Sequence, residues 1–168
     1  MIARRDTCGR YAFFVNNKTG WFHDIDLPLL CRTDDGGHTR RELKMDMNIE
    51  GVFFSDEMTG WAVGRRTKAE GEQHPGRRFG KVWAVIEHTV DGGKTWNTQY
   101  EELTDKNLFY RGLRGIFFTD RKTGWAVGFK GITLHTEDGG KHWVRQKSSS
   151  SNRLLKNSLH KSKSDSIM

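Results

Sequence analysis

Short apolar runs alternate with glycine-containing polar segments along the chain, most clearly between Gly115 and Gln146. Four runs in this stretch are rich in aromatic and β-branched residues, which favour strands: Ile116–Phe118, Trp125–Phe129, Ile132–His135 and His142–Val144. The segments between them, Asp-Arg-Lys-Thr-Gly, Lys-Gly and Glu-Asp-Gly-Gly, are typical of tight turns, because Gly adopts positive φ and Asp hydrogen-bonds to its own turn backbone. The pattern predicts a four-stranded antiparallel meander.

The same unit occurs twice more upstream. Phe53–Gly64 repeats its first half and His88–Trp96 its second half, with about 17 additional residues between the halves. A more divergent copy comprises Phe13–Trp21 and Thr33–Arg40, in which an arginine replaces the last tryptophan of the later copies. A repeat of roughly 40–47 residues with four strands is typical of a β-propeller blade, since each blade buries its faces only against its neighbours.

We therefore predict an all-β fold, a partial β-propeller of about three four-stranded antiparallel blades within residues 1–147. The units are expected at about residues 10–45, 49–103 and 113–147, with a basic insertion at 65–80 in the second unit. Residues 148–168 are rich in serine and carry a net charge of +3. Such a segment buries too little apolar surface to offset chain entropy, so we predict a disordered basic tail.

The composition fits thin blades better than one deep core. Only 35% of the 168 residues are apolar, and 19 glycines against two prolines suit many hairpins. No run reaches the roughly 18 apolar residues of a membrane-spanning helix. The N-terminus lacks the apolar core of a signal peptide, so we do not expect the chain as written to be exported, and its location stays unknown, with the cytoplasm as the default.

Cysteine and histidine form no metal-ligand pattern. Cys8 and Cys31 lack zinc-type spacing, and we interpret each as a small apolar strand residue rather than as half of a disulfide. His88 and His135 occupy matching positions in separate units, so their side chains should not converge on one ion. We predict no metal, no cofactor and no catalytic residues.

The pattern Thr-x-Asp-x-Gly-x-x-Trp marks the last turn of the second and third units. A hydroxyl and a carboxylate two residues apart can hydrogen-bond to the turn backbone, and the tryptophan can cover the turn and pack against the neighbouring blade. Equivalent aspartates in separate blades should lie far apart, which favours a structural role. The predicted structural residues are Thr89, Asp91, Gly93, Trp96, Thr136, Asp138, Gly140 and Trp143.

Positive charge gathers in the insertion and in the tail, within a chain whose net charge is +7. Basic residues outside a sheet can attract an acidic partner, and the candidate partner-binding residues are Arg65, Arg66, Arg77 and Arg78. The alternative interpretation is a solvated loop whose charge serves solubility. We rank nucleic-acid binding last, because it would require aromatic residues interleaved with the charges. Phe79 is the only aromatic residue in the two basic segments.

The repeated strings resemble two related propeller repeats. Thr-Val-Asp-Gly-Gly-Lys-Thr-Trp at Thr89–Trp96 resembles the Asp-box, or BNR repeat, of sialidases and many other β-propellers. The fuller string at Phe53–Gly64 is similar to the photosystem II stability/assembly factor family, and the resemblance extends over roughly Tyr11–Gln146. It implies a seven-bladed propeller that binds a membrane-protein precursor through a basic surface, in proteins that are often exported or lumenal. Known closed propellers have at least about four blades, which leaves open a truncated product, an open arc or part of an oligomeric ring.

We predict a non-catalytic binding or assembly module whose partner is a protein, acidic or membrane-associated, with self-association through open blade faces. The alternative is a glycosidase-like enzyme or its carbohydrate-binding remnant. Sialidases also need an arginine cluster, a Tyr/Glu pair and an acidic aspartate, and nothing links Tyr11, Tyr100 or Tyr110 to such a set. An acidic pocket lined by several blades would favour the enzyme, and a flat basic face would favour the binding module.

Overall fold

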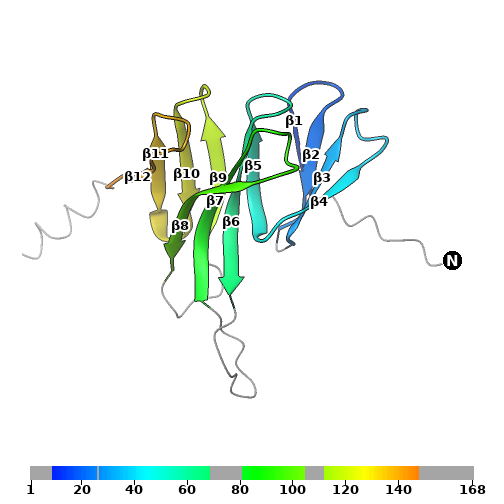
Figure 1. Cartoon of the computed structure of the whole chain (residues 1–168). Helices are drawn as coiled ribbons and strands as arrows, with labels where there is room; N and C mark the ends of the chain where they lie inside the picture. Colours follow the sequence, from blue (N-terminus) through cyan, green and yellow to red (C-terminus); the bar gives the residue numbers. More distant parts are fainter. Residues whose placement is uncertain (1–8, 26, 69–80, 105–111, 148–168) are drawn as a thin grey trace, which may run out of the picture.

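The computed structural model describes residues 9–25, 27–68, 81–104 and 112–147. Its twelve strands form three four-stranded antiparallel sheets, each a meander in chain order (Figure 1). The first sheet contains β1 (Tyr11–Phe14), β2 (Gly20–His23), β3 (Leu29–Thr33) and β4 (Arg41–Lys44). The second contains β5 (Asn48–Phe54), β6 (Gly60–Lys68), β7 (Lys81–Thr89) and β8 (Asn97–Leu103). The third contains β9 (Leu113–Phe118), β10 (Gly124–Gly128), β11 (Thr133–Thr136) and β12 (Val144–Arg145).

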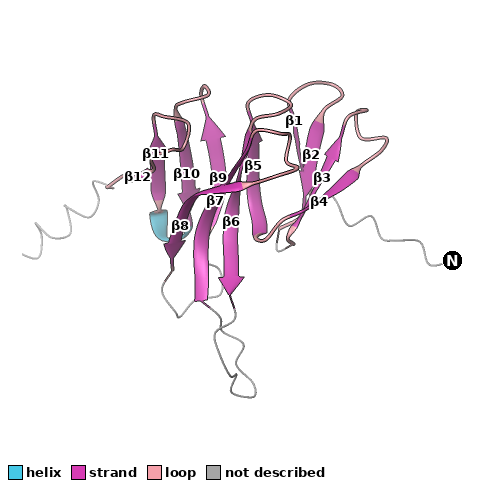
Figure 2. Cartoon of the chain, viewed as in Figure 1, coloured by secondary structure: helices cyan, strands magenta, loops and turns pink. Residues whose placement is uncertain are grey.

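The sheets stand side by side as three blades of a propeller, with the second between the other two (Figure 1). Figure 2 shows strand and loop in nearly all of the described chain, apart from the short 3-10 turn η1 (Phe129–Gly131). The predicted all-β architecture of three four-stranded blades is therefore confirmed. The tail predicted at residues 148–168 lies outside the described residues.

Stacked aromatic pairs fill the interfaces between sheets. Trp21 of β2 stacks on Phe54 of β5, with ring centroids 3.5 Å apart and an interplanar angle of 6°. Trp61 of β6 stacks on Phe118 of β9 in the same way, at 3.8 Å. All four side chains are at most 2% exposed. Each buried aromatic contributes about 1.5–3 kcal/mol, so these pairs account for much of the adhesion between sheets.

The glycine of each Thr-Gly-Trp segment makes this packing possible. A Cβ atom at Gly60 would lie 2.2 Å from the ring of its cross-strand partner Phe54, and one at Gly124 would lie 2.5 Å from Phe118. The phenylalanine of the first strand therefore lies against the bare backbone of the second strand. Its other side then meets the tryptophan of the preceding sheet.

The predicted basic insertion begins inside a strand. Arg65–Lys68 continue β6 and pair with Lys81–Ala84 of β7, so the hairpin is longer than its counterparts in the other sheets. The remaining insertion residues, 69–80, lie outside the described part of the chain.

Cys31 corrects one interpretation of the sequence. The residue is fully buried in β3, as expected of an apolar strand position, but it is disulfide-bonded. Spacing did not indicate this pairing, because a disulfide depends on the three-dimensional approach of two Cβ atoms. Within the residues that the structure describes, no helix has the length and apolar character needed to cross a membrane.

Candidate functional site

Each sheet carries the same hydrogen-bonded turn between its third and fourth strands. In the second sheet, the Gly93 N–H donates to Thr89 Oγ1 (3.0 Å), and the Thr89 hydroxyl donates to Asp91 Oδ1 (2.8 Å). Asp91 also accepts from the backbone N–H of Thr95 (2.9 Å) and from its hydroxyl (2.6 Å). The threonine and the aspartate thus satisfy backbone donors that the turn would otherwise leave free.

The third sheet repeats this turn with one substitution. Thr136 donates to Asp138 (2.9 Å) and accepts from the Gly140 N–H (2.9 Å). His142 takes the place of the last threonine, and its Nδ1 lies 2.6 Å from Asp138 Oδ2. The first sheet holds Asp35 in the same arrangement.

These contacts keep the turn aspartates ionised. Burial alone would raise the pKa of Asp91, but hydrogen bonds from Thr95 and Thr89 outweigh it and lower that pKa to about 2. Hydrogen bonds from His142 and then from Thr136 lower the pKa of Asp138, also to about 2. A carboxylate held in this way is a poor proton donor at neutral pH, so its chemistry fits a structural acceptor.

The turn tryptophans pack onto the phenylalanines of the sheet interfaces. Trp96 donates its Nε1–H to Gly93 O (3.0 Å), and its ring meets Phe54 edge-on at 6.1 Å. Trp143 meets Phe118 in the same way at 5.9 Å. The turn motif therefore supports the aromatic layer between sheets rather than a reaction centre.

The three turns lie in separate hairpins along one edge of the molecule, the upper edge in Figure 1. Their aspartates do not converge on a common point. Among the described residues there is also no group of three or more His, Cys, Asp and Glu side chains that could hold a metal ion.

The structure places Arg65 and Arg66 in β6, where both form ion pairs within the protein. Arg65 contacts Glu50 at 3.0 Å. Three carboxylates contact the Arg66 guanidinium: Asp46 (2.9 Å), Glu87 (2.5 Å) and Glu101 (3.0 Å). Arg77 and Arg78 lie outside the described residues. A role of these four arginines in partner binding stays a prediction.

The Arg66 cluster is buried at its centre. Arg66 is 9% exposed and Glu87 only 2%. Burial raises the pKa of Glu87, despite hydrogen bonds from Thr98 and Arg66. Burial would lower the pKa of Arg66, but its hydrogen bonds to the three carboxylates raise that pKa above its usual value, so the guanidinium stays charged.

Sequence reasoning missed this cluster, although a signal was present. Glu87 lies two residues before the turn threonine, where the other units have Cys31 and Leu134, so an acidic residue occupies an otherwise apolar position of the repeat. A carboxylate at such a position requires a cation nearby. The first residues of the insertion supply that cation.

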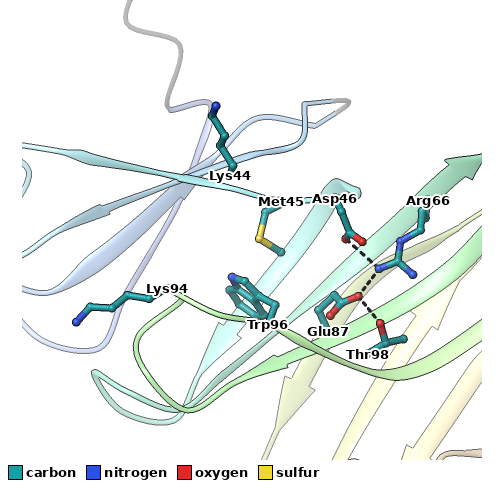
Figure 3. Close-up of a pocket in the computed structure, with 8 residues that line it drawn as sticks. All are labelled: Lys44, Met45, Asp46, Arg66, Glu87, Lys94, Trp96 and Thr98. Atoms are coloured by element: carbon teal, nitrogen blue, oxygen red, sulfur yellow. Dashed lines mark hydrogen bonds and ion pairs between the residues drawn. The ribbon is translucent and has the colours of Figure 1, made fainter.

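A polar cavity of about 250 Å³ lies next to this cluster, between the first and second sheets (Figure 3). Its lining residues are Lys44, Met45, Asp46, Arg66, Glu87, Lys94, Trp96 and Thr98. Figure 3 shows the Arg66 ion pairs on one side, with Lys44 and Lys94 apart from them. Both lysines are exposed, and their ammonium groups point away from the ion pairs (Figure 3).

The cavity is better suited to binding than to glycoside hydrolysis. A glycosidase needs one carboxyl group that holds a proton and a second that is ionised. Here Asp46 and Glu87 both contact one guanidinium, Arg66, so Glu87 is held as an acceptor for a cation rather than as a free proton donor, even though burial raises its pKa. The lysines can meet an anionic group, and Trp96 offers an apolar surface beside them.

Comparison with known proteins agrees with the resemblance seen in the repeats. The model of a family described as photosynthesis system II assembly factor YCF48 matches residues 37–155. The photosystem II assembly lipoprotein Ycf48 of Synechococcus sp. (strain CC9902) is 30% identical over 104 residues, which cover 62% of this chain and 25% of the relative. The chloroplastic photosystem II stability/assembly factor HCF136 of Arabidopsis thaliana is 37% identical over 57 residues, or 34% of this chain and 14% of the relative. The chain thus matches a quarter or less of the length of these two proteins.

A solved structure, YCF48 bound to D1 peptide, has a similar fold. The superposition has a TM-score of 0.56 at 23% identity, and it covers 84% of this chain and 41% of that one. At this identity the likeness shows the fold alone, which is that of a β-propeller.

Proposed function

Because the chain belongs to the photosynthesis system II assembly factor YCF48 family, we propose that it is a non-catalytic assembly module that binds a polypeptide partner. The match of the family model to residues 37–155 carries this proposal, since it spans β4 of the first sheet and the whole of the second and third sheets. The solved YCF48 structure, with its D1 peptide, shows that a propeller of this fold can hold a peptide.

The partner's contact surface is basic in this proposal. Lys44 and Lys94 flank the cavity, and its two acidic lining residues, the exposed Asp46 and the buried Glu87, both have Arg66 as counter-ion. β6 leads from Arg66 into the insertion, whose Arg77 and Arg78 add further positive charge in sequence. Such a surface fits a peptide with carboxylate groups and an apolar side chain that can lie against Trp96. Arg65 and Arg66 support this surface from within the hairpin.

The test measures the binding of a fluorescently labelled D1 peptide by anisotropy. We expect the double variant K44E/K94E to bind about tenfold or more weakly, because two attractive charges become repulsive. R77E/R78E should weaken binding in the same direction, and both effects should diminish at high salt.

The matched control is K122E/K141E, which makes the same charge change at exposed lysines of the third sheet's turns. It should bind as the unmodified chain does. Equal affinities for K44E/K94E and K122E/K141E would exclude the cavity as the binding surface. Absence of any peptide binding by a folded, unmodified chain would contradict the proposed function itself.

A further inference from the structure

The two interfaces between sheets are built to one plan. The second strand of one sheet contributes a tryptophan, Trp21 or Trp61, and the first strand of the next contributes a phenylalanine, Phe54 or Phe118. At the second interface, Val63 of β6 is fully buried in the same apolar cluster as Trp61 and Phe118. Each interface therefore has two sides. We call the side of a sheet that bears the tryptophan its tryptophan face, and the side that bears the phenylalanine its phenylalanine face.

Polar contacts follow the same plan. The indole of Trp21 donates to Gly92 O in the turn of the next sheet (3.2 Å). Trp61 reaches the equivalent Gly139 O through Gln99, with both hydrogen bonds at 3.1 Å.

A second polar contact bridges the turns between first and second strands. Asn16 donates to Glu57 (2.8 Å) across the first interface, and Arg121 contacts Asp56 (3.2 Å) across the second. Asp56 is the counterpart of Asn16 in the second sheet, and Arg121 is the counterpart of Glu57 in the third. The same two positions of the repeat therefore meet at both interfaces.

The third sheet presents the tryptophan face to solvent. Strand register places one row across all four of its strands: Phe117, Trp125, His135 and Val144. Trp125 is 36% exposed where Trp61 is 1% exposed, and Val127 is 47% exposed where Val63 is buried.

The first sheet presents the complementary phenylalanine face. Phe14 occupies the position of Phe54 and Phe118 but is 41% exposed. Asn17 stands at the position of Glu57, and Gly36 at that of Gly92. The two faces lie at opposite ends of the row of sheets (Figure 1).

We propose that a second copy of this chain docks head to tail, with the tryptophan face of one third sheet against the phenylalanine face of another copy's first sheet. Trp125 then stacks on Phe14, its indole faces Gly36 O, and Asp120 accepts from Asn17, which reproduces the internal plan. Two copies joined at both ends would have six blades, within the usual range of closed propellers.

One residue makes this contact less close than the internal interfaces. Phe22 stands where the second and third sheets have Ala62 and Ala126, and the Arg40 guanidinium lies 4.0 Å from its ring centroid. The larger side chain narrows the space that receives the tryptophan. Association should therefore be weaker than the internal packing, and Phe22→Ala should strengthen it.

The test is sedimentation velocity of the full chain over a range of concentrations, with W125E, F14E and their equimolar mixture. Each single variant should associate about tenfold or more weakly. The mixture should form a one-to-one pair, because each variant keeps one intact face. Both altered residues are exposed, and circular dichroism melting confirms that the variants are folded.

Several outcomes would overturn the proposal. A chain that stays monomeric at all concentrations would do so, and so would normal association of F14E, which would point to two third sheets docking face to face. Failure of the mixture to associate would exclude head-to-tail docking. Folded F22A that associates no more tightly than the unmodified chain would show that the first sheet's face is not the receiving surface.

Discussion

At the scale of single residues, three aspartates organise the turns. Asp35, Asp91 and Asp138 each accept a threonine hydroxyl from two residues earlier and a backbone N–H from four residues later. One side chain thus ties both ends of a turn together. Because these bonds are made to the charged form, the turns depend on ionisation and hence on pH.

We expect Asp91 to make folding stability fall in acid. Its pKa is about 2 in the folded chain, below the usual value of 3.8, so the unfolded chain binds more protons between these values. The contribution of Asp91 to the free energy of unfolding is complete above about pH 4 and is lost as pH falls through about 2. Asp91→Asn should flatten this part of the profile, and Asp91→Ala should also lower the melting temperature by roughly 4 °C.

Thermal melting at pH values from 7 to 2 provides the measurement. Glu137→Gln serves as control, since this exposed acid lies beside the third turn's aspartate and should leave the profile unchanged. A D91N profile that parallels the unmodified one would show that the hydrogen bonds to Asp91 do not stabilise the fold.

At the scale of elements, the β6–β7 hairpin is the least regular part of the repeat. Its extra length carries Arg66 to the carboxylate of Glu87, which is buried on the next strand. The hairpin needs this ion pair for its stability, because a buried carboxylate without a cation is strongly unfavourable.

Removing only Arg66 from its ion pair with Glu87 should lower the free energy of unfolding more than removing both residues. We expect Arg66→Met to destabilise the chain by about 3–5 kcal/mol, since it leaves Glu87 buried and uncompensated. The double variant R66M/E87M should recover much of that loss. Arg121→Met is the control, because its ion pair with Asp56 is exposed and worth at most about 1 kcal/mol. Urea unfolding gives all values, and a double variant no more stable than R66M would contradict the argument.

At the scale of the whole molecule, repetition made the fold predictable. The strand order and the three sheets could be predicted from the apolar runs and the glycine-containing turns, because the same pattern recurs in each of the three units. The structure adds the contact between sheets, in which Phe54 lies over Gly60 and its ring stacks on Trp21.

Features that occur only once were not predictable in this way. The disulfide of Cys31 and the ion pairs of Arg66 have no equivalent in the other units. Both depend on which residues the fold brings together across strands, information that spacing along the chain does not contain. The candidate cavity was missed for the same reason, since Lys44 and Lys94 come from different units.

The second sheet alone has a neighbour on each face, and this should appear in the rates of amide hydrogen exchange. In a row of repeats, local opening requires the loss of neighbouring contacts, so the middle unit opens least often. We expect the slowest exchange in β6 and β7, and faster exchange in β2 and β10, which are second strands of the outer sheets with a neighbour on one face only. Exchange followed by mass spectrometry at low protein concentration measures this order. Equal protection of the three sheets would mean that the row opens as one cooperative unit.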